Sequence, residues 1–208
     1  MRGRPLLMVL LAAALLVTGC TRLKKCAYEG FGRDKWQKPD EVVALLDLRR
    51  GEVVADLGAG GGYFTFRFAS AVGPEGIVYA IDVDGGMLDA IRDEAIGRGL
   101  ANVRTVLASP DDPGLAAASV DLVFLANTFH HLPERPAYFR RLAAALRPGG
   151  TVVIVEYEPR GFVAGWLGHS VESEEIAREM AEAGYVLVRR HDVLERQSFQ
   201  VFAAEGAR

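Results

Sequence analysis

The stretch that decides the fold is Val53-Val54-Ala55-Asp56-Leu57-Gly58-Ala59-Gly60-Gly61-Gly62-Tyr63. Its first five residues form a compact apolar run that predicts a buried strand, and residues 63–72 predict a helix. Glycines between a strand and a helix let the backbone approach a ligand closely and leave amide groups at the helix start to bind it. The sequence therefore predicts a binding loop directly after residues 53–57.

The spacing of the glycines narrows the kind of ligand. In the dinucleotide-binding pattern G-x-G-x-x-G that starts at Gly58, the third glycine would fall at Tyr63. The observed pattern is Asp-x-Gly-x-Gly-x-Gly, with Asp56 two residues before the first glycine. A carboxylate there repels a pyrophosphate and suits a ligand that carries an ammonium group. The pattern therefore disfavours a nicotinamide-dependent reductase.

Short apolar runs alternate with helical stretches along the rest of the chain. We expect strands at 53–57, 77–81, 103–107, 121–126 and 151–157, and helices that begin at 39 and span 63–72, 87–98, 136–146 and 173–183. Residues 185–193 and 198–203 lie too close together for a parallel crossover and are expected to pair antiparallel. The sequence thus predicts an α/β fold: a doubly wound sheet of seven strands, mostly parallel, with one reversed strand from a C-terminal hairpin.

The loop at residues 56–62 resembles motif I of the class I S-adenosylmethionine-dependent methyltransferases. Three further stretches share the resemblance: Tyr79-Ala80-Ile81-Asp82-Val83-Asp84, with an acid 24 residues after Gly58, Met87-Leu88, and Leu146-Arg147-Pro148-Gly149-Gly150-Thr151. The resemblance covers roughly residues 36 to 203. It implies a Rossmann-like sheet, S-adenosyl-L-methionine as the cofactor and methyl transfer as the reaction.

The resemblance also implies which residues bind the cofactor: Asp56, Gly58, Ala59, Gly60, Gly62, Asp82, Asp111 and Asn127. Asp82 matches the acid that binds the ribose hydroxyls in the family. Ser109 stands where the family often has an acid near the adenine, so we expect Asp111, or else Asp112, to replace it. The alternative for both residues is a polar turn with solvated carboxylates.

The segment Asn127-Thr128-Phe129-His130-His131-Leu132 follows the fourth expected strand. It lacks the Asn-Pro-Pro-Tyr motif of enzymes that methylate amides or exocyclic amines. It is similar to methyltransferases that act on small molecules, including quinone-ring C-methyltransferases. His130 and His131 are the candidate catalytic residues, as a general base or as substrate contacts. The alternative is that one histidine packs in the core and the other caps the following turn.

The N-terminus has the features of an export signal. Arg2 and Arg4 precede a twelve-residue apolar run at 6–17. That run is shorter than the about 20 residues of a transmembrane helix and typical of a signal peptide. Val17-Thr18-Gly19-Cys20 resembles the bacterial lipobox, with Cys20 as the lipidation site. We therefore expect a lipoprotein signal peptide at 1–19, a tether at 20–35 and the methyltransferase domain at 36–208. The alternative is an amphipathic or buried first helix.

Composition limits the partners. The chain of 208 residues has 24 basic and 27 acidic side chains, a net charge of −3, which argues against a nucleic-acid binder. Two cysteines cannot make a disulfide scaffold, and we expect no metal site. The glycine-spaced apolar segment at 161–169 is interpreted as a substrate lid, a membrane-facing patch or a hydrophobic plug.

These observations lead to one main hypothesis and one alternative. The main hypothesis is a methyltransferase with a small, lipophilic acceptor, anchored to the membrane of the bacterial cell envelope through Cys20. The alternative is an exported lipoprotein that keeps the fold as a binding module without catalysis. The cofactor is made in the cytoplasm and a lipobox implies export, so a spurious leader would place the protein in the cytoplasm.

Overall fold

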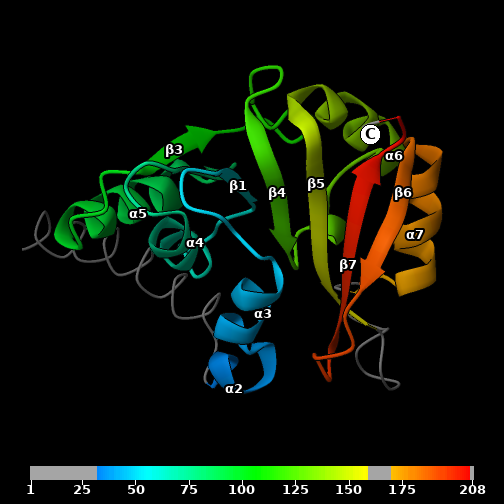
Figure 1. Ribbon diagram of the computed structural model, residues 1–208, viewed down its shortest axis with the longest axis horizontal. Coiled ribbons are helices and arrows are strands. Elements are labelled where there is room, and N and C mark those ends of the chain that lie inside the picture. The colour runs from blue at the N-terminus through cyan, green and yellow to red at the C-terminus, as the bar shows by residue number, and fades with distance from the viewer. Residues whose placement is uncertain (1–31, 159–169, 207–208) are drawn as a thin grey trace, which may run out of the picture.

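The computed structural model describes residues 32–158 and 170–206, which build one seven-stranded sheet with helices on both faces (Figure 1). The strands are β1 (Val53–Leu57), β2 (Ile77–Asp82), β3 (Val103–Leu107), β4 (Val120–Ala126), β5 (Leu146–Tyr157), β6 (Tyr185–Arg190) and β7 (Gln197–Ala204). The helices are α2 (Arg33–Gln37), α3 (Pro39–Leu45), α4 (Thr65–Val72), α5 (Gly85–Gly97), α6 (Arg135–Leu142) and α7 (Ser173–Glu182), with short 3₁₀ turns η1 (Phe129–His131) and η2 (Ala143–Ala145). The predicted leader, Cys20 and the 161–169 segment lie outside the described residues.

The strand order is β3-β2-β1-β4-β5-β7-β6. The first five strands in this order are parallel, and β7 runs antiparallel to both β5 and β6. The predicted doubly wound sheet with one reversed strand is therefore confirmed. The strand order changes direction between β1 and β4: the chain leaves β1 toward α4 on one face of the sheet and leaves β4 toward α6 on the other. In open α/β sheets, ligands bind outside the carboxyl ends of the strands at such a switch point.

Both faces of the sheet are covered. Helices α3, α4 and α5 lie on one face and α6 and α7 on the other (Figure 1). Val54 and Phe124 point to the α4 side, while their neighbours Ala55 and Val123 point to the α6 side. Because both faces are dry, the central strands read as continuous apolar runs instead of alternating ones.

Phe124 is the centre of the core on the α4 side. Its ring is fully buried and lies 4.7 Å from the ring of Phe64 and 4.9 Å from that of Phe68, measured between centroids. Both partners belong to the segment that follows the glycine loop. The packing of Phe124 therefore fixes α4 on the sheet and, with it, the loop that leads into α4.

The boundary between α6 and β5 differs from the prediction. The expected helix at 136–146 ends at Leu142, and β5 already begins at Leu146. Arg147 donates to Asp121 Oδ2 at 2.8 Å, the oxygen that also accepts from the backbone N–H of Val53. This shared carboxylate ties β5 to the starts of β1 and β4, and tertiary contacts override the helical preference of the preceding alanines.

Helix α2 begins inside the stretch assigned to the tether. Residues 33–35, at the end of that stretch, are helical and form the first turn of α2. Gly32 (φ 72°) and Lys38 (φ 44°) place a left-handed residue at each end of α2. No helix in the described ranges is long and apolar enough to cross a membrane.

We expect Phe124→Ala to lower the free energy of unfolding by about 3–5 kcal/mol, because it removes a ring from a filled core. Val188, about half exposed on β6, is the matched control. Val188→Ala should change the free energy of unfolding by no more than about 0.5 kcal/mol. Urea unfolding of the full chain measures both, and equal losses for the two variants would contradict the central role of Phe124.

Candidate active site

A cavity of about 500 Å³ lies at the carboxyl ends of β1, β2 and β4. This volume falls in the range of about 300–1,000 Å³ of small-molecule sites. Its walls come from α2, from the loops after four strands and from α6, and include Arg33, Asp56–Gly61, Asp82–Asp84, Ala108–Pro110, Ala126–Thr128, His131 and Tyr138. The structure thus brings together Asp56, Gly58, Ala59, Gly60, Asp82, Asn127 and His131 from the predicted site.

The glycine loop needs its glycines for two different reasons. A Cβ on Gly58 (φ 77°) would lie 2.2 Å from Thr128 Oγ1, so the loop can pass the β4 end only without a side chain. A Cβ on Gly60 (φ 52°) would meet nothing within 4 Å, so this backbone opens onto the cavity. Gly62 does not line the cavity. A Cβ there would lie 2.6 Å from the Phe66 ring, so the packing of Phe66 requires a glycine at this position.

Asp82 fixes the loop to the end of β2. Its Oδ2 accepts from the Gly60 N–H at 2.8 Å, and its Oδ1 accepts from the Asp84 N–H at 2.9 Å. Each carboxylate oxygen has two lone pairs, so these bonds leave acceptor capacity at the cavity rim. The arrangement presents a rigid anion that suits a ligand with hydroxyl groups.

Asp56 and Arg33 bring opposite charges to one part of the cavity. Asp56 is buried, and Thr65 Oγ1 donates to its Oδ2 at 2.6 Å. Burial raises the pKa of Asp56 from 3.8 to about 6, although the bond from Thr65 and the nearby Arg33 guanidinium oppose the shift. A ligand ammonium beside Asp56 would stabilise its charged form, and a ligand carboxylate would suit Arg33.

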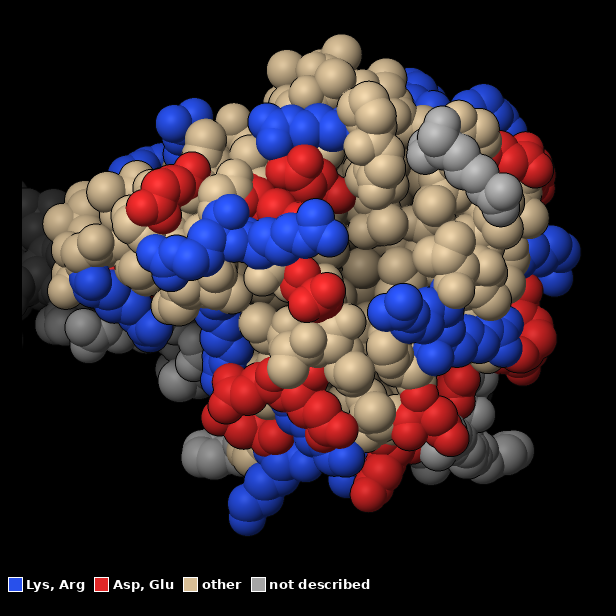
Figure 2. Space-filling view, in the orientation of Figure 1, with Lys and Arg blue, Asp and Glu red and all other residues tan. Residues whose placement is uncertain are grey.

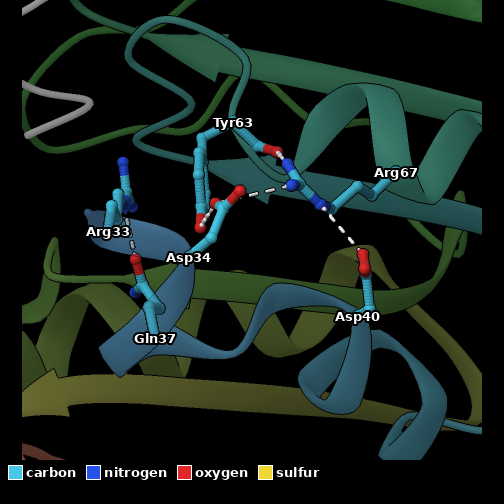
Figure 3. Close-up of polar contacts among 6 residues, drawn as sticks. All are labelled: Arg33, Asp34, Gln37, Asp40, Tyr63 and Arg67. Atoms are coloured by element: carbon cyan, nitrogen blue, oxygen red, sulfur yellow. Dashed lines mark hydrogen bonds and ion pairs between the residues drawn. The ribbon is translucent and has the colours of Figure 1, made fainter. Parts of the chain in front are cut away.

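Contacts with α4 and its leading loop hold α2 over the site (Figure 3). The Arg33 guanidinium lies 3.8 Å from the centroid of the Tyr63 ring, and the Tyr63 hydroxyl donates to Asp34. Arg67 pairs with Asp34 at 3.6 Å and with Asp40 at 3.3 Å. Sequence reasoning missed Arg33 because no motif surrounds it: only the folded chain brings α2 to the loop.

The structure does not bring the predicted adenine contact into the cavity. Asp111 is exposed and accepts from Ser109 Oγ at 2.9 Å, while Asp112 accepts from the Gly114 N–H at 2.8 Å. Backbone bonds between Ser109 and Asp112 close a tight turn that carries both acids away from the wall. Ser109 and Pro110 line the cavity instead.

Asn127 lies at the end of β4 with a left-handed backbone (φ 54°). Its N–H donates to the Val155 carbonyl at 2.8 Å, and its Oδ1 accepts from Gln197 Nε2 at 2.7 Å. Gln197 is buried on β7. The reversed strand therefore helps to hold a cavity residue in place.

The two histidines of η1 point in different directions. His131 lines the cavity, as the prediction of an acceptor contact requires. His130 does not: its side chain is 6% exposed, and its Nδ1 lies 3.0 Å from Oε1 of Glu156. His130 is thus a buried partner of Glu156 and not a wall residue.

Charge and metal-ligand patterns are unremarkable in the described part of the chain. Basic and acidic side chains are interspersed over the face that Figure 2 shows. Within residues 32–158 and 170–206, no group of three or more His, Cys, Asp or Glu side chains is placed to hold a metal ion.

Known proteins resemble the part of the chain that carries this cavity. Residues 54–150 match the family model described as "Methyltransferase domain". Aklanonic acid methyltransferase DauC of Streptomyces sp. (strain C5) is 37% identical over 111 residues, which are 53% of this chain and 50% of that protein. The ubiquinone/menaquinone biosynthesis C-methyltransferase UbiE of Ectopseudomonas mendocina (strain ymp) is 31% identical over 121 residues, 58% of this chain and 47% of that protein. The chain spans about half the length of these curated relatives.

The fold also resembles that of a solved methyltransferase structure. A SAM-dependent methyltransferase from Aquifex aeolicus superposes with a TM-score of 0.78 at 24% identity, covering 86% of this chain and 96% of that one. Residues 54–150 therefore match a methyltransferase domain, and the chain has the fold of that solved SAM-dependent methyltransferase.

Proposed function

We propose that the protein transfers a methyl group from S-adenosylmethionine to a small, lipophilic acceptor. The observation that carries this proposal is the Asp82 carboxylate bonded to the Gly60 amide at the rim of the 500 Å³ cavity. It lies within the segment that matches the methyltransferase model. The names of the two relatives, which refer to aklanonic acid and to ubiquinone and menaquinone, support an acceptor of this kind.

The residues around the cavity fit the parts of this cofactor. Asp82 would accept from the ribose hydroxyls, beside the open backbone of Gly60. Asp56 and Arg33 would take the ammonium and carboxylate of the amino-acid tail, because their charges are opposite and both line the cavity. The turn at Ser109 and Pro110 would border the adenine. When bound, the cofactor supplies an activated methyl group on a sulfonium.

The remaining wall would hold the acceptor. His131, Leu132 and Tyr138 combine an apolar surface with one imidazole. Such a wall orients the acceptor atom toward the methyl group and excludes water. Where the acceptor has a proton to lose, the ring of His131 is placed to accept it.

We expect Gly60→Val to abolish measurable cofactor binding, because the new side chain fills space at the cavity while meeting no protein atom. Gly51→Val is the matched control: Gly51 also has a positive φ (88°) and open space around its Cβ, but it is outside the cavity. Isothermal titration with the demethylated product, S-adenosylhomocysteine, measures both. Conversion of labelled cofactor to this product with quinone and phenol acceptors then tests turnover. Equal affinities for the two variants would contradict the assigned cavity.

The charged pair predicts a selective effect on the amino-acid tail. Arg33→Leu and Asp56→Asn should each weaken the binding of S-adenosylhomocysteine by about tenfold or more, because each removes about one charged hydrogen bond to the ligand. Neither substitution should change the affinity for 5′-methylthioadenosine, because this compound lacks the amino-acid tail. Arg196→Leu is the control: its guanidinium lies 5.8 Å from the ring of Trp36 on α2, and Arg196 does not line the cavity.

The same pair predicts a pH dependence. Burial raises the pKa of Asp56 to about 6, so the carboxyl becomes protonated below that pH and loses its attraction for an ammonium. Product affinity should therefore fall about tenfold from pH 7 to pH 5. Asp56→Asn should flatten this profile, and a profile that stays steep in that variant would contradict the assignment.

We also propose that Cys20 anchors the mature protein to the membrane. The apolar run at 6–17 and the lipobox-like residues 17–20 support this proposal. In a bacterial host, Cys20→Ser should move the protein from the membrane fraction to the soluble fraction, because the lipidated thiol is lost. Mass spectrometry of the mature N-terminus is the check. An unprocessed, unlipidated chain would place the enzyme in the cytoplasm instead.

A further inference from the structure

Glu156 is a fully buried carboxyl group that the cavity does not explain. Its side chain is 0% exposed, and it lies near the end of β5 behind η1. Its Oε2 has no hydrogen-bond partner among the described residues. A carboxylate in such a place is costly unless a paired group compensates for the lost water, so its partner matters.

Two donors converge on the other oxygen. Oε1 accepts from the Tyr157 N–H at 3.0 Å, and Nδ1 of His130 also lies 3.0 Å from it. A carboxylate has only acceptors, so the proton in the second bond belongs to Nδ1. The bond that a histidine makes at one ring nitrogen sets its tautomer, so this contact favours the tautomer of His130 with the proton on Nδ1.

The ring of His130 packs directly against that of His131. The two centroids are 3.9 Å apart with an interplanar angle of 48°, and His131 is the histidine on the cavity wall. Arg135 adds a positive charge near Glu156, although its guanidinium is held mainly by Glu179 and Glu175. A chain of contacts therefore runs from a buried anion through one imidazole to a second imidazole at the cavity.

We propose that Glu156 and His130 are positioning residues: Glu156 fixes the proton on Nδ1 of His130, and the ring of His130 held in this way orients the imidazole of His131 toward the acceptor. This inference rests on the proposed function. In the reaction the bond from methyl to sulfur breaks as the bond from methyl to the acceptor atom forms. The proton that the acceptor loses passes to a ring nitrogen of His131.

Nuclear magnetic resonance tests the contact chain independently of activity. The full-length chain, labelled with ¹⁵N-histidine, has four histidines, which His169→Gln and His191→Gln help to assign. We expect wild-type His130 to carry its proton on Nδ1. Glu156→Leu should abolish this pattern and shift the ring signals of His131, whereas Glu156→Gln, which keeps a side-chain oxygen as acceptor, should preserve both.

Gln200→Leu is the matched control. Gln200 is also buried and polar, and it lies on β7. Its Nε2 donates to the Ser173 carbonyl at 2.9 Å, so its hydrogen bond does not involve the two histidines. It should leave the signals of both histidines unchanged. Should Glu156→Leu fail to fold, the wild-type tautomer and the Glu156→Gln spectrum still decide. A wild-type His130 protonated on Nε2 alone, or His131 signals that ignore Glu156→Leu, would overturn the proposal.

Kinetics provide the second readout. Glu156→Leu should lower kcat by about tenfold or more, a part of the 10²–10⁴-fold that a positioned base contributes, with KM for S-adenosylmethionine unchanged. Glu156→Gln should recover most of kcat, and unchanged kcat in both variants would overturn the positioning role. Absence of turnover in the wild type would instead refute the proposed function, while the spectra would still decide on the contact chain.

Discussion

The bonds between the glycine loop and the end of β2 are the constraint on which the site depends. The Ile81 carbonyl accepts from the N–H groups of Gly58 and Ala59, and the Asp82 carboxylate accepts from that of Gly60. Three successive amides are thereby turned toward a neighbouring strand. The loop becomes a flat backbone surface, so a ligand can lie against it without displacing side chains.

Contacts with the glycine loop also position the other walls of the cavity. Gly58 approaches Thr128 so closely that the loop after β1 and the loop after β4 share one side of the cavity. Packing of Phe64 on Phe124 fixes the turn into α4. The neighbouring Tyr63 ring packs against Arg33 of α2. Each feature adds a charged or apolar group to a crevice that strand order had already opened.

Much of this was readable from the sequence because it is local. The buried strands are continuous apolar runs, the glycine loop sits between its strand and helix, and Asp82 ends the next strand, so pattern and spacing located all three. The reversed strand followed from the short link after Arg190. These few short-range patterns are enough to predict the fold and the central residues of the candidate site.

The remainder depends on contacts between distant residues. Arg33 enters the cavity only because α2 packs on Tyr63, and nothing near it in the sequence indicates this. Asp111 is carried outward by a turn whose direction two backbone bonds decide. His130 and His131 are adjacent in the sequence, but His130 contacts Glu156 on β5 whereas His131 lines the cavity. No periodicity encodes such choices.

The position of β7 affects the order in which the molecule can be completed. It is the last strand in the chain, yet it lies between β5 and β6 and supplies Gln197 to Asn127. Until residues 197–204 have left the ribosome, β5 has an open edge and β6 has no partner in the sheet. The five parallel strands precede β7 in the sequence, so the sheet is complete only when β7 has paired on both sides. The central part of the sheet is therefore closed by residues that are far apart in the sequence, because β7 has to pair with both β5 and β6 before either strand is covered on that side.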